Sequence, residues 1–229
     1  MSISQIRKEL SKRSDPDRAK ASQWFFKTGP GEYGYGDKFL GLRVPQVREL
    51  VKMFPNVPLD EISQLLQSEW HEERLLALLM LVRMFKHGDR TAIYRFYFKH
   101  SKFINNWDLV DSSAPVIVGG YFQDRSRAPL YLLAKSKTLW ERRIAMLAAF
   151  HFIKRDDFED AFKIAEILLS DQQDLIHKAV GWMLREIGKR DRPAEERFLK
   201  QHCKKMPRTM LRYAIEKFPE PLRQRYLDL

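Results

Sequence analysis

The residues best suited to chemistry lie in one polar segment, NNWDLVDSSAP, which combines a tryptophan with two aspartates. Trp107 and Asp111 are four residues apart, so on a helix an indole and a carboxylate project side by side. Asp108 points to a different face. Such a pair can place a negative charge beside an aromatic surface. The structural alternative is that Trp107 packs in the core while the aspartates cap the helix.

A second tryptophan lies on a basic helix face. Four side chains follow one another at steps of four, three and four residues, which places them on one face of a helix: Lys178, Trp182, Arg185 and Lys189. The apolar stripe of the same segment is formed by Ile176, Val180, Leu184 and Ile187. An indole among cations suits contact with nucleic acid, because the ring can stack on sugars or bases while the cations neutralise phosphates. A solvated basic face that tolerates one aromatic residue is the alternative.

Other cations are placed where they could meet an anion. Arg143 follows Trp140 by three residues on a partly apolar face. A guanidinium there needs a negative partner, and a phosphate, Asp111 or another acidic neighbour would serve. Near the end of the chain, steps of three and four predict either a cationic edge or a solvated face, made of Arg197, Lys200, Lys204, Arg208 and Arg212.

The elements that must position these residues are helices. Apolar residues recur at spacings of three and four through most of the chain, and no alternating strand pattern appears. The main interruption is the glycine-rich segment 28–42. It lacks the consecutive Lys and Ser/Thr of a phosphate-binding loop and follows no predicted strand. We therefore expect an ordered connector there rather than a nucleotide site.

The helices show a weak internal repeat. A basic residue precedes a largely apolar stretch at Arg74, Arg143, Lys178 and Arg212, with steps of 69, 35 and 34 residues. The first step predicts a missing unit near position 109, within NNWDLVDSSAP. A period near 35 is typical of helical solenoids, in which equivalent helices line one wall. We predict an all-α fold, an α-α superhelix of HEAT-like repeats with 1–229 as a single domain; a generic helical bundle is the alternative.

Composition narrows the partners and the compartment. The 229 residues include 41 Lys and Arg against 30 Asp and Glu, a formal charge of +11 that favours nucleic acid. The single cysteine, Cys203, excludes an intramolecular disulfide and indicates a reducing, cytoplasmic setting. The N-terminus is charged and the longest apolar run has eight residues, so we expect neither export nor a membrane span. The six histidines show no metal-ligand spacing, and we expect no metal or cofactor.

Five segments together resemble the AlkD-like DNA alkylation repair family, whose members are HEAT-like repeat DNA glycosylases: GLRVPQVREL, NNWDLVDSSAP, LWERRIAML, HKAVGWMLREIGKRD and RTMLRYAIEKF. The resemblance implies that Asp111 is the catalytic carboxylate, that Trp107 and Trp182 are aromatic walls, and that Arg143 is the basic partner. It also implies that Arg43, Arg48 and Arg185 hold the DNA backbone. The basic faces add Lys178, Lys189, Arg208 and Arg212 as expected DNA contacts.

The activity that the resemblance implies is removal of positively charged N3- or N7-alkylated purines from double-stranded DNA, the first step of base excision repair, by a monomer. Such a base is already cationic and leaves without a general acid, so one carboxylate suffices. The family is understood to grip the backbone and sugar while the lesion stays stacked. A non-catalytic nucleic-acid-binding solenoid and a scaffold for an acidic helical protein remain the alternatives.

Overall fold

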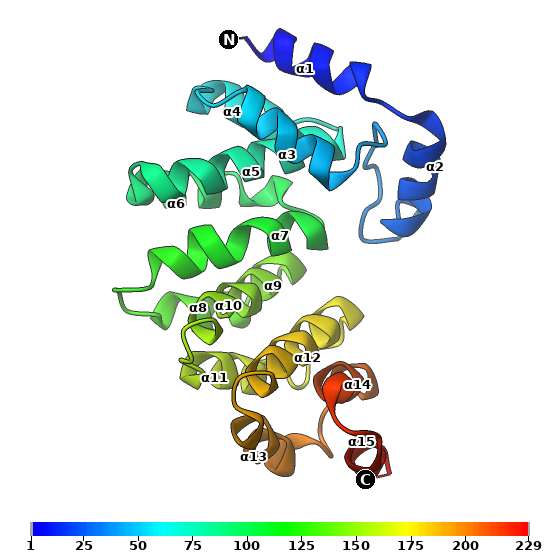
Figure 1. The fold of residues 1–229 in the computed structure, drawn as a ribbon, viewed down its shortest axis with the longest axis vertical. Helices are drawn as coiled ribbons and strands as arrows, with labels where there is room; N and C mark the ends of the chain where they lie inside the picture. The colour runs from blue at the N-terminus through cyan, green and yellow to red at the C-terminus, as the bar shows by residue number, and fades with distance from the viewer. Residues whose placement is uncertain (1, 229) are drawn as a thin grey trace. The chain divides into compact units, whose positions relative to one another are not determined.

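The computed structural model describes residues 2–228 and divides into two compact units, 1–113 and 114–229, which are described one at a time (Figure 1). Both units are helical. Among the described residues, β pairing is limited to one isolated bridge between Lys38 and Trp70. None of the helices between residues 2 and 228 is both long and apolar enough to span a bilayer.

The first unit is built around one central helix. Its elements are α1 (Ile3–Lys12), α2 (Pro16–Phe25), α3 (Val44–Met53), α4 (Leu59–Leu66), α5 (His71–His87), α6 (Arg90–Lys99), η1 (Ser101–Phe103) and the start of α7 (Trp107–Ala114). Helix α5 packs against α3, α4 and α6. It is apolar on all sides, with every residue from 75 to 81 buried, as expected of a helix surrounded by others. Its burial extends to the polar residues of its first turn, which must therefore find partners inside the protein.

The glycine-rich segment 28–42 is a loop without helix, as the sequence predicts. The Glu72 carboxylate fixes its end by accepting the backbone N–H groups of Leu40, Gly41 and Leu42 at 2.8–3.2 Å. Gly41 has φ +86°, and a Cβ there would lie 2.1 Å from the Asp15 carbonyl oxygen, so only glycine fits. The connector is thus tied both to α5 and to the start of α2.

The second unit contains the remaining helices. They are η2 (Pro115–Gly119), α8 (Ala128–Ala134), α9 (Leu139–Ala148), α10 (Phe150–Ile153), α11 (Glu159–Ile167), α12 (Asp174–Gly188), α13 (Arg192–His202), α14 (Arg208–Ala214), η3 (Ile215–Lys217) and α15 (Glu220–Leu227). Helix α9 packs on α8 and α12, and α12 packs on α13 and α14. Gly181 permits the last contact, because a Cβ there would lie 2.4 Å from the Met210 carbonyl. Helix pairs that stack on the next pair are the packing of an α-α solenoid, and the all-α fold class is confirmed.

The repeat is visible in where five of the helices begin. Helices α5, α7, α9, α12 and α14 begin at residues 71, 107, 139, 174 and 208, in steps of 36, 32, 35 and 34. The period near 35 is confirmed. The fifth residues of these helices are Leu75, Asp111, Arg143, Lys178 and Arg212. Asp111 therefore takes the position that basic residues take in three other repeats.

The register predicted for the first two repeats was wrong. Arg74 is the fourth residue of α5, and its guanidinium donates to the carbonyl of Ser68, six residues earlier. The side chains that make the same bond in later repeats are Arg142, to Ser136, and His177, to Asp171. Arg74 thus corresponds to these two rather than to Arg143, and position 109 is a buried leucine in α7. In a weak sequence repeat, a basic residue at the fourth position of a helix cannot be distinguished from one at the fifth. The two positions nevertheless make different hydrogen bonds.

Candidate functional site

Helix α7 starts at the predicted tryptophan. The fully buried Asn106 accepts the backbone N–H of Trp107 through its side-chain oxygen, at 2.8 Å. Trp107 and Asp111 then occupy successive turns, four residues apart, and both side chains are half-buried. This agrees with the face predicted from their spacing and leaves part of each accessible to a ligand.

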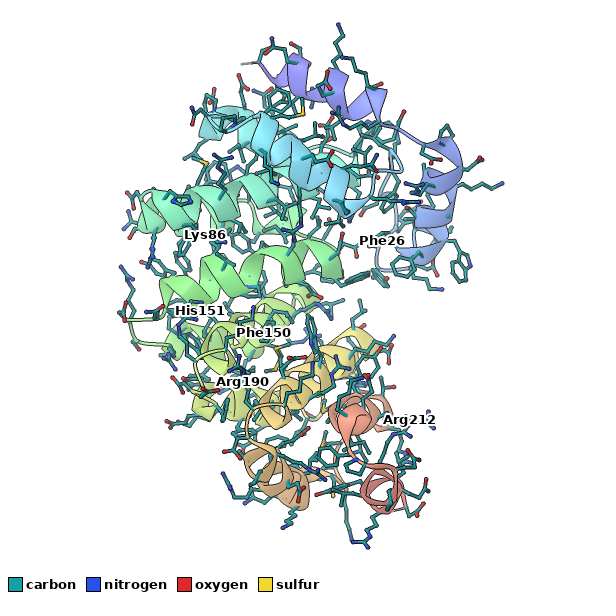
Figure 2. The ribbon with its side chains drawn as sticks, viewed as in Figure 1. Phe26, Lys86, Phe150, His151, Arg190 and Arg212 are labelled. Atoms are coloured by element: carbon teal, nitrogen blue, oxygen red, sulfur yellow. The ribbon has the colours of Figure 1, made fainter. Side chains whose placement is uncertain are left out.

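Aromatic rings on one side hold Trp107. Its ring stacks on Phe26 with centroids 5.4 Å apart and planes 19° apart, and Phe26 in turn stacks on Phe39 at 5.1 Å (Figure 2). Phe25 meets Trp107 edge to face at 5.9 Å. These contacts fix the orientation of the indole without burying it fully.

Buried charged residues hold Asp108, the residue that follows Trp107 in α7. His71, the first residue of α5, is 2% exposed, and its Nε2 lies 2.8 Å from an oxygen of Asp108. Its Nδ1 lies 3.4 Å from Asp37, in the connector, and Asp37 lies 2.7 Å from the Arg74 guanidinium. The ring of His71 also stacks on Phe39 at 4.7 Å. The spacing of Trp107 and Asp111 gave no sign of this network, although the four polar residues of the first turn of α5, directly before a strongly apolar stretch, were a signal that buried partners were needed.

The network sets the protonation state of His71. Burial opposes a charged imidazole, but the Asp108 carboxylate and the hydrogen bonds to Asp108 and Asp37 outweigh it and raise the pKa of His71 to about 9. Burial would raise the pKa of Asp37, yet its bond to His71 and the charge of Arg74 lower it overall. An imidazolium therefore bridges two carboxylates at neutral pH and ties the first turn of α7 to α5 and to the connector.

Asp111 lies one turn beyond this anchored start. Together with burial, its negative charge raises the pKa of Tyr97, against the opposing hydrogen bond from Ser113. The Tyr97 hydroxyl lies 3.1 Å from the Ser113 hydroxyl. The two aspartates of the segment are thus distinguished by place: Asp108 is committed to His71, and Asp111 lies on the face that Trp107 shares.

The second unit holds the other predicted tryptophan on α12. Trp182 is half-buried, donates from Nε1 to Glu186 at 3.1 Å and lies 5.7 Å from the Phe150 ring (Figure 2). Glu186 also pairs with Lys189 at 2.6 Å. An indole with a polar partner and an open side is thus present on the predicted basic face.

The other cations predicted on α9 and α12 have acceptors within the second unit. Arg143 is 4% exposed and donates to the carbonyl of Leu175. Lys178 pairs with Asp174 at 2.7 Å, and Arg185 pairs with Glu216. The predicted contacts of Lys178 and Arg185 with DNA phosphates remain predictions.

Five predicted DNA contacts are exposed: Arg43, Arg48, Lys189, Arg208 and Arg212, the last labelled in Figure 2. Arg43 is the N-cap residue of α3, and its recess, of about 710 Å³, is also lined by the cations Lys12, Arg13 and Arg18 and by one carboxylate, Asp15. That recess is basic, as a backbone-binding surface would require.

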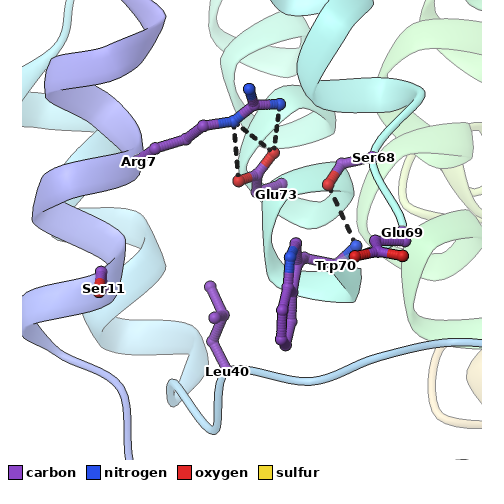
Figure 3. Close-up of a pocket in the computed structure, with 7 residues that line it drawn as sticks. All are labelled: Arg7, Ser11, Leu40, Ser68, Glu69, Trp70 and Glu73. Atoms are coloured by element: carbon purple, nitrogen blue, oxygen red, sulfur yellow. Dashed lines mark hydrogen bonds and ion pairs between the residues drawn. The ribbon is translucent and has the colours of Figure 1, made fainter.

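A second recess, of about 540 Å³, opens beside α1 and the start of α5 (Figure 3). It is lined by Arg7, Ser11, Leu40, Ser68, Glu69, Trp70 and Glu73. Arg7 and Glu73 pair there at 3.1 Å, and none of the four predicted catalytic residues lines it. Across the described part of the chain, no cluster of His, Cys, Asp or Glu could hold a metal ion.

Comparisons with known proteins give one consistent result. Residues 6–218 match the model of a family described as DNA alkylation repair enzyme. The fold is similar to the structure of a predicted DNA alkylation repair enzyme from Enterococcus faecalis, with a TM-score of 0.71 and 16% identity over 91% of this chain and 98% of that one. No curated protein matches the chain.

Proposed function

Because the chain belongs to the DNA alkylation repair enzyme family, we propose that it hydrolyses the N-glycosidic bond of cationic N3- or N7-alkylated purines in duplex DNA. The observation that carries the proposal is the pair Trp107 and Asp111, half-buried on α7 with its first turn fixed by rings and buried charge. A preorganised carboxylate beside an aromatic surface suits a reaction that develops positive charge.

The reaction needs few groups. The bond between C1′ and the purine nitrogen breaks, and its electron pair neutralises the positively charged base, so no acid is required to protonate it. Positive charge grows on the deoxyribose, where Asp111 stabilises it and orients the attacking water. The oxygen of that water bonds to C1′ and its proton is lost through Asp111 to solvent. The products are the free alkylpurine and an abasic site.

The other predicted residues complete this proposal. Trp107 and Trp182 provide aromatic surfaces for the sugar, and Arg143 is the basic partner of the reacting centre. The backbone phosphates contact Arg43, Arg48, Lys178, Arg185, Lys189, Arg208 and Arg212. Phosphate can replace the present partners of Lys178 and Lys189, because surface ion pairs contribute little stability. The protein acts as a cytoplasmic monomer without a cofactor and leaves the lesion stacked, so it needs no deep base pocket.

The test is release of 7-methylguanine or 3-methyladenine from methylated duplex DNA by the purified protein. We expect Asp111→Asn to reduce release about 100- to 1000-fold, the scale on which loss of one electrostatic contact acts, and to leave the Kd for duplex within about twofold. Asp60→Asn, an exposed change in α4, is the matched control and should act as wild type. Wild-type protein that binds duplex but releases neither base would instead be a nucleic-acid-binding solenoid without this activity.

A further inference from the structure

An exposed aromatic surface lies at the end of α2, beside the candidate site. Trp24 is 77% exposed, Phe25 55% and Tyr35 66%, and we call these three residues the aromatic surface. Helix α2 buries no residue at all. Single exposed apolar residues are ordinary, but large rings concentrated within twelve residues indicate a surface that meets a partner.

The backbone holds these rings in place. Lys27 ends the helical segment with φ +56°, a left-handed conformation that side-chain-bearing residues rarely adopt. Gly34 returns the connector against this turn by donating to the Lys27 carbonyl at 3.0 Å, and a Cβ at Gly34 would lie 2.4 Å from the Phe26 carbonyl. The turn sends Phe26 inward onto Phe39 while Phe25 stays exposed. A left-handed residue directly after the C-cap is a common way to end a helix, and here it fixes the direction in which the chain leaves α2.

The aromatic surface is continuous with the ring of the candidate site. Phe25 contacts Trp107 edge to face at 5.9 Å, and Phe25 and Phe26 also meet edge to face at 5.1 Å. A ligand that lies on Trp107 therefore extends onto Phe25. The ammonium of Lys27 lies over the ring of the neighbouring Trp24, 5.2 Å from the ring centroid.

Apolar rings combined with positive charge match nucleic acid. The ammonium of Lys27 attracts phosphate, and the faces of Trp24 and Phe25 suit the deoxyribose rings of the backbone, which every nucleotide of a duplex presents. Lys20, also exposed on α2, adds a second cation. The chain's formal charge of +11 agrees in sign with such a partner.

We propose that the aromatic surface, with Lys27, is a contact surface for duplex DNA that binds the nucleotides next to the one held at Trp107. This inference rests on the proposed function for the identity of the neighbouring site. It assigns to α2 and the connector a role in binding and none in bond cleavage. The surface supplies affinity by contact of its rings with the sugars and by charge, so its loss weakens binding of DNA whether or not a lesion is present.

The experiment compares Trp24→Ala/Phe25→Ala with Leu132→Ala, a matched change of a 71% exposed residue on α8. Fluorescence anisotropy measures the Kd for an unmodified duplex, and single-turnover kinetics measure release of 7-methylguanine. We expect the double variant to raise the Kd about tenfold, because two large rings that contact the DNA are lost. At saturating protein, Trp24→Ala alone, which leaves Phe25 in contact with Trp107, should keep the release rate within about threefold of wild type. Lys27→Gln should weaken binding and reduce its dependence on salt.

The outcomes separate this inference from the proposed function. Unfolding curves of the double variant should match wild type, because the rings are exposed. A Kd equal to that of Leu132→Ala overturns the inference, and so does a wild-type dimer that the double variant turns into a monomer, since the surface would then bind a second copy. Wild type that releases no purine, with duplex binding still dependent on Trp24 and Phe25, supports the surface and refutes the glycosylase.

Discussion

The two units hold their tryptophans by different means. In the first, Trp107 rests on a stack of rings, and the adjacent Asp108 is bonded to a histidine that is 2% exposed. In the second, Trp182 has one hydrogen bond to Glu186, which is shared with an exposed lysine. Buried charges are rigid and intolerant of change, whereas exposed pairs rearrange easily. The comparison teaches that α7 is built to stay still, while the basic face of α12 can exchange its partners for a ligand.

The largest expected effect comes from breaking the buried network. His71→Leu leaves Asp37 and Asp108 without their shared cation, so we expect a loss of about 3–5 kcal/mol in the free energy of unfolding, measured with urea. His87→Leu, at the exposed end of the same helix, is the control and should change it by less than about 0.5 kcal/mol. Equal effects of the two changes would mean that the network does not hold the first unit together.

The pH dependence of stability tests the charge on His71. Its pKa is raised from 6.5 to about 9 by Asp108 and Asp37 against the effect of burial, so its stabilisation is fully present below pH 6.5 and is lost as the pH rises through 9. We expect the free energy of unfolding to fall by about 3 kcal/mol over this window. His71→Gln should remove that fall. A wild-type profile that matches the variant would show that the imidazole is neutral.

A buried carboxyl gives the second unit a different window. Burial raises the pKa of Glu195 from 4.5 to about 8, so its contribution is fully present below pH 4.5 and is lost as the pH rises through 8. Glu195→Gln cannot ionise. We expect it to exceed wild type in stability by at least about 2 kcal/mol at pH 8.5 and to lose this advantage near pH 5, as measured by urea unfolding at both values. A constant difference between the two proteins would contradict the shift.

The smallest effect is expected at the exposed pair of α12. Asp174→Ala removes the carboxylate 2.7 Å from the Lys178 ammonium. Stability should change by less than about 0.5 kcal/mol, as is usual for exposed pairs. Affinity for duplex DNA at low salt should rise about twofold, because a negative charge beside a phosphate contact is removed. Asp60→Ala in the first unit is the control, and an equal rise there would point to net charge alone.

Local patterns predicted a large part of this molecule. The spacing of Trp107 and Asp111 placed them on one helix face, and the glycines at 28–42 predicted the connector. The period near 35 followed from basic residues before apolar helices. These signals are short-range, because each depends on the geometry of one helix or one turn.

The parts that were missed depend on distant partners. His71 contacts Asp37 and Asp108, which are 34 and 37 residues away in the sequence. Phe26 contacts Trp107, although helices α3 to α6 lie between them in the sequence. No local pattern relates these residues, since only tertiary packing brings them together. The register of Arg74 was missed for a related reason. Its role is set by the carbonyl to which it donates, and the identity of that carbonyl appears only once the helix ends are known.

The repeat register has a consequence for how such a protein could acquire an activity. Arg143, Lys178 and Arg212 occupy the fifth residue of their helices, and α7 places Asp111 at that same step. The position that is basic in three repeats is thereby acidic in α7, and a carboxylate there repels phosphate but stabilises a positively charged sugar. On the proposed function, selectivity for damage would begin as one charge reversal in a duplicated module, with no new architecture required.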